Sequence, residues 1–466
     1  MATRTEEDFI GKVQVPANAY YGIFTVRASG NFQISSHRPS RNFIRMLALV
    51  KKSAAEANVQ TGALPTRIGG AIARAAAEAA EGKFDSQFIL DSFTAGAGTP
   101  FNMNMNEVLA NRAEELLGGR RGSYKLVHPN NHVNMSQSSN DAIPTAIRLA
   151  LLYESQSVIA EAEKLAAEIE KKSRDCANVI KVGRTHLMDA VPLTVGDELS
   201  AFSSALRKDI LHLQSSLDSL RELPIGGTAL GSGINTHPDY RRLVVRRIAA
   251  NTGIRVSESR NLFRAISQSS DFLAYSSSLR SLAAAIHKIS NDFKLLSSGP
   301  NTAIGEYILP EVEPGSSIMP GKVNPSVPEC AEMIAVRVIA NDSAVLLATL
   351  GGQLQLNVQT PLILHSLSES NHLLANGCKM LREHCISGLK LNRQKIQQHL
   401  EASLISLTAL APYFGYAKMS SLVKKAQKEG KSIKQVVLEE KLLTEQQYDR
   451  LMSPQRLTRP SKKEKL

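Results

Sequence analysis

The middle of the chain carries apolar side chains at the spacing of an α-helix over a long stretch. Their steps are four, three, four and three residues, at Leu206, Ile210, Leu213, Leu217 and Leu220. This spacing gathers the side chains on one face and predicts a helix that packs lengthwise against its neighbours. Because such an apolar seam needs partners along its whole length, it constrains the fold to a bundle of long helices.

Other segments predict helices of similar length. Apolar residues recur at helical spacing from Val158 to Ile169, and long helices are also predicted over 261–296 and 328–350. Aromatic residues make up only 5% of the chain and tryptophan is absent, which favours helices over strands. We predict a mainly all-α fold in which a central bundle of long helices is completed by the subunits of an oligomer.

Breaks rich in glycine and proline divide the chain between these helices. The predicted domains are an N-terminal domain over 1–140, a central long-helix bundle over 141–392 and a small C-terminal domain over 393–466. The C-terminal domain ends in a basic tail between Arg456 and Lys465. A chain of 466 residues is long enough for a large core and for more than one domain.

Composition narrows the classes of function. Hydrophobic residues at 43% and charged residues at 21% are typical of a soluble globular protein. The net charge of +12 would suit an acidic ligand or a nucleic acid. The basic residues are spread along helices, however, and no nucleic-acid motif accompanies them, so we expect no nucleic-acid partner.

The sequence gives no sign of export or of a membrane. Its N-terminus lacks an apolar signal region, and no apolar run approaches the roughly 18–20 residues of a membrane helix. The four cysteines lack disulfide spacing, and we expect Cys378 and Cys385 to lie in the core. These features predict a reducing, cytoplasmic compartment and no membrane partner.

A loop rich in small and polar residues lies between two of the predicted helices. From Gly315 to Pro325 it reads Gly-Ser-Ser-Ile-Met-Pro-Gly-Lys-Val-Asn-Pro. Two glycines and two prolines exclude a regular helix or strand. Its hydroxyls, ammonium group and backbone N–H groups could bind an anion, although an ordinary surface loop would have a similar composition.

Every position of this loop resembles the signature loop of the aspartase/fumarase superfamily, also called the fumarate lyases. The resemblance extends from Arg4 to about Arg456. It implies that Ser316 is the base that removes a proton from the carbon next to a substrate carboxylate. It also implies that Lys322 and Asn324 bind a substrate carboxylate.

A second motif is Gly-Arg-Thr-His, which ends at His186. A lone histidine more often packs than reacts, but this one matches the Thr-His pair of the superfamily. The resemblance implies that Thr185 and His186 contact the substrate, and that Glu329 is the charge partner of His186. A carboxylate paired with an imidazole would fix its tautomer.

Two further motifs resemble substrate-binding loops of the superfamily. The sequence Gln-Ser-Ser-Asn-Asp ends at Asp141 and could simply cap a helix. The resemblance makes its Ser138, Ser139 and Asn140 carboxylate ligands. In the same way, the Gly-Ala-Gly-Thr sequence that ends at Thr99 implies a substrate-binding threonine.

Three residues depart from the pattern of the superfamily. Pro100 replaces a small polar residue after the threonine, Met188 replaces a glutamine after the Thr-His pair, and Asp197 replaces the glutamine of a Gly-Gln-Glu sequence. These changes concern the surroundings of the site and leave the class of reaction intact.

The reaction of the superfamily is anti elimination across the C2–C3 bond of a succinyl group, through an aci-carboxylate, with release of fumarate. Ala97 and the Tyr-Tyr-Gly sequence ending at Gly22 resemble aspartases, whereas Ser139 and the Gly-Glu pair ending at Glu306 resemble class II fumarases. We expect an aspartate ammonia-lyase, with class II fumarase as the alternative and a non-catalytic structural protein as a remote one.

The resemblance also implies a homotetramer whose active site combines three subunits, with a small dicarboxylate as substrate. No His, Cys, Asp and Glu grouping has metal-ligand spacing, and no nucleotide-binding fingerprint is present. We therefore expect no cofactor and no bound metal at the site. Activation by a divalent cation such as Mg²⁺ is an implication of the resemblance alone.

Overall fold

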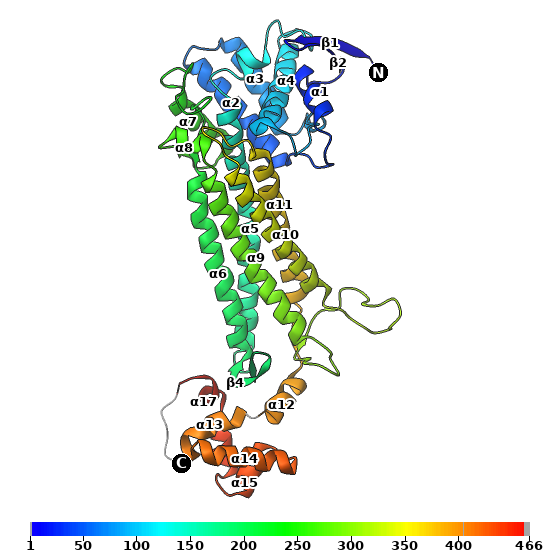
Figure 1. Ribbon diagram of the computed structural model, residues 1–466, viewed down its shortest axis with the longest axis vertical. Helices are drawn as coiled ribbons and strands as arrows, with labels where there is room; N and C mark the ends of the chain where they lie inside the picture. Colours follow the sequence, from blue (N-terminus) through cyan, green and yellow to red (C-terminus); the bar gives the residue numbers. More distant parts are fainter. Residues whose placement is uncertain (1, 404, 461–466) are drawn as a thin grey trace. The chain divides into compact units, whose positions relative to one another are not determined.

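The computed structural model describes residues 2–403 and 405–460, and helices dominate it (Figure 1). The predicted mainly all-α fold is therefore confirmed. Strands form only two-stranded pairs in the part described. These are β1 (Thr3–Asp8) with β2 (Gly11–Pro16), β3 (Ile180–Thr185) with β4 (Met188–Thr194), β5 (Glu222–Leu223) with β6 (Ser257–Glu258), and β7 (Tyr307–Ile308) with β8 (Lys390–Leu391).

Long helices make up the centre of the sequence, as predicted. They are α5 (Ser139–Asp175), α6 (Val195–Leu220), α9 (Ser270–Leu296), α10 (Ser326–Leu350) and α11 (Thr360–Leu381). The apolar seam from Leu206 to Leu220 lies on α6, and all of its side chains are buried. The helix predicted over 261–296 is interrupted, because Gln268 adopts an extended backbone between α8 (Leu262–Ser267) and α9.

The chain forms two compact units, each assembled from several stretches of sequence. Unit 1 consists of Met1–Ala160, Asp209–Ala284 and Ile334–Ala375, and unit 2 of Glu161–Lys208, Ala285–Met333 and Asn376–Leu466. Each long helix contributes one part to each unit. The division into domains 1–140, 141–392 and 393–466 stays a prediction.

Unit 1 packs shorter helices beside its share of the long ones. The helix α2 contacts α3, α4 and α7, and α4 also contacts α1. The shorter elements of the unit are α1 (Ile23–Asn31), α2 (Arg41–Gln60), α3 (Thr66–Ala80), η1 (Asp85–Gln87), η2 (Gly96–Gly98), α4 (Thr99–Leu116), η3 (Pro129–Val133), α7 (Tyr240–Thr252) and α8.

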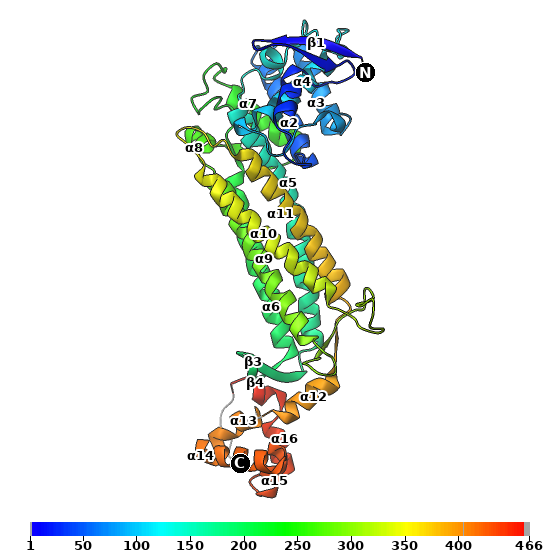
Figure 2. The ribbon, with the colours of Figure 1, turned by 45° about the vertical axis from the view of Figure 1, so that its right-hand side comes forward.

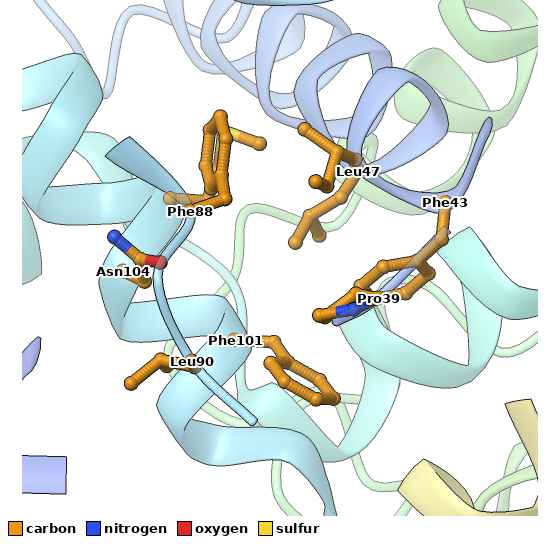
Figure 3. Close-up of a pocket in the computed structure, with 9 residues that line it drawn as sticks. Pro39, Phe43, Leu47, Phe88, Leu90, Phe101 and Asn104 are labelled. Atoms are coloured by element: carbon orange, nitrogen blue, oxygen red, sulfur yellow. The ribbon is translucent and has the colours of Figure 1, made fainter. Parts of the chain in front are cut away.

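A small cavity lies in the core of unit 1 between α2 and α4 (Figure 3). Its volume is about 10 Å³, and its lining includes Phe43, Leu47, Phe88 and Phe101. Asn104 is a polar member of the lining, but its amide already donates to the Gln87 carbonyl. A cavity this small and apolar is a packing defect rather than a substrate site.

Unit 2 surrounds the β3–β4 hairpin with helices from the end of the chain (Figure 2). The helix α12 contacts β3, while α13 and α17 contact β4. The elements of this end are η4 (Arg382–Ile386), α12 (Arg393–Ala402), α13 (Ile405–Phe414), α14 (Tyr416–Glu429), α15 (Ile433–Glu439), α16 (Glu445–Leu451) and α17 (Pro454–Thr458). The four helices from α13 to α16 share a separate apolar cluster. Half of the predicted basic tail, 461–465, lies outside the described residues.

The helix α10 is long and apolar enough, by length and composition, to cross a membrane. The expectation that no apolar run approaches this limit is therefore wrong. Only 33% of its most apolar window is buried within this chain. Large apolar side chains exposed on it are Met333, Val336, Leu346, Leu347 and Leu350. An exposed apolar surface of this kind is typical of an interface.

The predicted core position of two cysteines is confirmed. Cys378 and Cys385 are buried and free, and burial raises the pKa of each thiol to about 12. A thiol that stays protonated at neutral pH is a poor nucleophile and metal ligand, so both act as small apolar residues.

Candidate active site

The loop from Gly315 to Pro325 is closed at its base by contacts within itself. The Gly315 N–H donates to the Lys322 carbonyl at 2.8 Å, and the Asn324 amide donates to the Gly315 carbonyl at 2.6 Å. A Cβ on Gly315 would lie 2.5 Å from the Lys322 oxygen, so this close approach requires glycine.

Ser316 lies inside this closed loop, and its hydroxyl oxygen faces backbone donors. It accepts N–H bonds from Ile318 at 3.2 Å and from Met319 at 3.0 Å. Such donors stabilise a negatively charged oxygen more than a neutral hydroxyl. Lys322 is exposed and has no ion-pair partner among the residues described here, so its ammonium group is available to an anion.

The second motif forms the tip of the β3–β4 hairpin in unit 2. Thr185 pairs with Met188, which leaves His186 and Leu187 as a two-residue turn. Both have positive φ, 55° and 61°, as a type I′ turn requires. Neither is a glycine or asparagine, so the turn is strained, and such strain is common at functional sites. The side chains of Thr185 and His186 are exposed at this tip.

The predicted pair of His186 and Glu329 is not formed within one chain. Glu329 lies exposed in the first turn of α10. Neither side chain makes a hydrogen bond or ion pair in the residues that the structure covers. An interaction between them would therefore require a second subunit or a different loop conformation.

A cavity in unit 2 borders the hairpin tip. It has a volume of about 300 Å³, and its lining includes His186, Lys181 and Arg184. A second cavity of about 430 Å³ also has Arg184 in its lining. The Thr-His turn therefore adjoins space that is large enough for a small acid, and the side chains that line it are of mixed charge, because Glu198 and Asp292 also belong to the lining.

In unit 1 the Ser138–Asn140 loop leads into α5 and is held by several side chains. The Ser138 hydroxyl accepts the Asn140 N–H at 3.2 Å, and the Asn140 amide donates to the Ala229 carbonyl at 2.7 Å. The amide of Asn102 donates to the Ser139 hydroxyl at 3.1 Å. The three predicted carboxylate ligands are thus brought together on one fixed loop.

Asp141 is the buried anchor of this loop. Its carboxylate accepts N–H bonds from Ser138 at 2.9 Å, Gly226 at 3.0 Å and Thr228 at 2.9 Å. Burial raises the pKa of this carboxyl group to about 7, against the opposing effect of those donors and of Lys51. Asp141 therefore ties the loop to the Gly226–Thr228 segment.

Lys51 is a further buried support that the sequence reasoning missed. Its ammonium group donates to the side-chain oxygens of Asn134 and Gln137, each at 3.0 Å. Burial lowers the pKa of Lys51 to about 7. The available signal was its position on α2, four residues after Leu47 and three before Ala54, on the apolar face.

Thr99 begins α4 after a turn of left-handed residues. Gly96, Ala97 and Gly98 have φ values of 70°, 54° and 80°. A Cβ on Gly98 would lie 2.9 Å from Ile143 of α5, so the turn packs closely against that helix. Asn102 lies one helical turn after Thr99 and contacts Ser139, which places Thr99 beside the Ser138–Asn140 loop.

Two of the three residues that depart from the superfamily pattern have a local structural role. Pro100 occupies the first turn of α4, where its missing N–H would have no partner in the helix. Asp197 caps the start of α6 through Thr194 and pairs with Arg459 at 2.7 Å, which ties the residue after α17 to α6. Met188 is 69% exposed at the hairpin tip, and nothing in the structure explains its side chain.

The unit 1 residues Thr99 and Ser138–Asn140 form one group. The unit 2 residues form two, the Thr185–His186 turn and the 315–325 loop. In the residues described, no group of three or more His, Cys, Asp or Glu side chains could hold a metal ion. Taken one by one, these groups offer hydroxyls and amides that can bind a carboxylate, an imidazole, a serine oxygen beside backbone donors, and a lysine elsewhere in the same loop as that serine.

Comparisons with known proteins match nearly the whole chain. A family described as Lyase matches residues 11–340, and one described as Fumarase C C-terminus matches residues 407–459. The chain is 45% identical over 464 residues to an aspartate ammonia-lyase of Pseudomonas aeruginosa, with 98% of each chain covered.

Relatives with a second activity are almost equally similar. The chain is 44% identical over 456 residues to a class II fumarate hydratase of Nitrosomonas europaea, covering 98% of this chain and 99% of that one. The crystal structure of a cobalt-bound fumarate lyase:delta crystallin of Brucella melitensis has a TM-score of 0.95 at 42% identity, covering 98% of this chain and 100% of that one.

Proposed function

This chain belongs to the aspartase/fumarase superfamily of lyases, and on that premise we propose that it eliminates ammonia from L-aspartate, reversibly, to give fumarate. The observation that carries the proposal is the closed 315–325 loop, in which the Ser316 hydroxyl accepts two backbone N–H bonds and which also carries the exposed Lys322. This combination supports a serine that acts as a base, because it favours the alkoxide form.

The proposed reaction begins with proton transfer from C3 of aspartate to the oxygen of Ser316. The electrons of the C–H bond move into the adjacent carboxylate and form the dianionic aci-carboxylate. Its collapse forms the C2–C3 double bond and expels ammonia from C2 on the opposite face. Fixed cations and N–H donors near the dianion would supply most of the stabilisation.

Lys322 and Asn324 are proposed to bind the carboxylate that becomes the dianion. Lys322 offers a point charge, and Asn324 offers an amide that now holds Gly315 at the loop base. The second carboxylate of the substrate would lie on Thr99 and the Ser138–Asn140 loop. Thr185 and His186 would complete the site, and Glu329 would pair with the imidazole.

We propose that these groups meet in a homotetramer. Exposed apolar side chains on α10 support an extended subunit interface, because a soluble monomer rarely leaves such a surface in water. The unformed His186–Glu329 pair is consistent with a site that needs more than one subunit. We also propose that the protein is cytoplasmic and that it needs no cofactor. Activation by Mg²⁺ is measured separately.

The choice of aspartate over malate rests on Ala97. Its side chain is buried two residues before Thr99, at a position where class II fumarases carry a serine. A methyl group there cannot hydrogen-bond a leaving hydroxyl, which favours an amine as the leaving group. The second candidate, class II fumarase with L-malate as substrate, is favoured by Ser139, whose hydroxyl is held by Asn102.

The deciding experiment incubates the purified protein with L-aspartate and, separately, with L-malate while fumarate absorbance is followed. Turnover of aspartate alone supports the proposal, and turnover of malate alone replaces it with the second candidate. Activity on neither substrate would favour adenylosuccinate or argininosuccinate as the substrate, or the remote alternative, a non-catalytic structural protein. Repeating the assay with Mg²⁺ and with a chelator tests activation by the cation.

A further inference from the structure

We propose that Glu306 is a positioning residue, which holds the Thr185–His186 turn in place through Arg184; the inference rests on the function proposed above. The Glu306 side chain is completely buried in unit 2. One carboxylate oxygen accepts from Arg184 at 2.7 Å and contacts the His399 imidazole at 2.9 Å. The other lies 3.0 Å from the ammonium group of Lys181.

The backbone of Glu306 is as firmly fixed as its side chain. Its N–H donates to the Leu296 carbonyl at the end of α9, at 2.9 Å, and its carbonyl accepts the Asn392 N–H at 2.9 Å. The next residue, Tyr307, pairs with Leu391 in the β7–β8 ladder. Glu306 is therefore a fixed point to which an exposed turn can be attached.

Arg184 is the residue that connects this point to the site. It directly precedes Thr185 and His186 at the end of β3. The His186 side chain makes no hydrogen bond or ion pair in the described part of the chain, and the turn itself is exposed and strained. The backbone pairing of Thr185 with Met188 fixes the local turn, and the anchoring of Arg184 adds a side-chain contact that can set the direction of the tip.

Stability alone is a weak reason for this cluster. Removing a carboxylate and its cations from water costs about as much as their attraction returns, so apolar residues would stabilise the fold as well. Lys181 also has a second partner, Glu198, at 2.9 Å. The contact between Glu306 and Arg184 is the one that reaches the turn, which favours positioning as its role.

The two cavities of unit 2 leave room for the Arg184 side chain to move. Arg184 lines both the cavity that includes His186 and the cavity that includes His399. Without Glu306 the guanidinium group could move into either space and take the Thr185–His186 turn with it. A displacement of about 1 Å at such a turn is enough to lower turnover about a hundredfold.

The test is a double-mutant cycle in the full-length protein, assayed with whichever of aspartate or malate it converts. Glu306→Gln is expected to lower kcat/KM about 10-fold to 100-fold. In a His186→Asn background the same change is expected to cost less than about twofold, because its effect passes through His186. An effect of Glu306→Gln that keeps its full size in the His186→Asn background overturns the proposal.

Asp271→Asn is the matched control for loss of a buried carboxylate. Asp271 pairs with Arg148 at 2.7 Å and Arg264 at 3.0 Å in unit 1. The Asp271→Asn substitution should lower the midpoint of thermal unfolding while leaving kcat/KM of the folded protein within about twofold of wild type. If Glu306→Gln does not fold, Arg184→Gln breaks the same contact at a side chain nearer the surface, and the cycle with His186→Asn is run on it.

A measurement without substrate separates this inference from the proposed function. Amide hydrogen exchange over residues 180–194 should be faster in Glu306→Gln than in wild type and unchanged in Asp271→Asn. Faster exchange together with no turnover of either substrate by wild type would support the positioning role and refute the lyase. Unchanged exchange in Glu306→Gln refutes the positioning role, whatever the protein converts.

Discussion

The Ser138–Asn140 loop of unit 1 rests on buried polar groups, whereas the 315–325 loop of unit 2 is closed by hydrogen bonds within itself. The first is tied to the Gly226–Thr228 segment by Asp141 and to α4 by Asn102. The second exposes Ser317, Ile318 and Lys322 and uses hydrogen bonds among its own residues. A loop with few contacts to the core opens and closes at low cost. If the proposed function holds, the difference means that the recognition loop is preformed, while the proposed base lies on a loop that can close over substrate.

The largest expected effect comes from the base itself. Ser316→Ala should lower kcat by about 10³-fold, because no other group would accept the C3 proton. Fumarate absorbance measures the rate, and size-exclusion chromatography checks that the oligomer is intact.

Ser317→Ala is the matched control for the loss of a hydroxyl in the same loop. Ser317 is exposed and makes no side-chain hydrogen bond in the described residues, so kcat should stay within about threefold of wild type. If Ser316→Ala keeps a near-normal rate, the 315–325 loop does not carry the base and the contrast between the loops loses its functional meaning.

The next effect tests the buried support of the unit 1 loop. Asp141→Asn places an amide N–H₂ among three backbone N–H donors and should lower the free energy of unfolding by about 2–4 kcal/mol. Denaturant unfolding followed by circular dichroism measures the change. Asp175→Asn, an exposed aspartate at the other end of the same helix, should change it by less than about 0.5 kcal/mol. Equal effects would show that Asp141 is no anchor.

The same contrast explains how far the sequence could predict the molecule. The seam from Leu206 to Leu220 predicted its helix, because apolar spacing is local information. The break at Gln268 had no glycine or proline to mark it and depends on contacts elsewhere in the fold. The predicted site residues came from short motifs, because a motif is also local information.

Supports that lie far apart in sequence could not be predicted in this way. Asp141 reaches Gly226 and Thr228, and Glu306 reaches Lys181 and Arg184, only once the chain is folded. The position of Lys51 on the apolar face of its helix indicated that its ammonium group could be buried. Without the fold, that pattern does not reveal which side chains a buried ammonium group would find.

A smaller effect is expected where the closed base of the 315–325 loop is disturbed. Gly315→Ala would place a methyl group 2.5 Å from the Lys322 oxygen and 2.7 Å from the Asn324 nitrogen. We expect kcat to fall about tenfold with little loss of stability, because the loop adds few contacts to the core. Gly321→Ala, where nothing lies within 4 Å, should cost less despite a φ of +79°. A larger loss of turnover in Gly321→Ala would contradict the closed-base geometry.

The smallest expected effect comes from a comparison of two isoleucines, one beside the Ser138–Asn140 loop and one in the 315–325 loop. Ile143, at the start of α5, is fully buried beside Gly98, whereas Ile318 at the tip of the 315–325 loop is 84% exposed. Ile143→Val should therefore lower the free energy of unfolding by about 1 kcal/mol, and Ile318→Val by less than about 0.3 kcal/mol. Parallel denaturant titrations measure both. If Ile318→Val destabilises the protein as much as Ile143→Val, the 315–325 loop is packed against another subunit in solution, and the two loops are equally fixed.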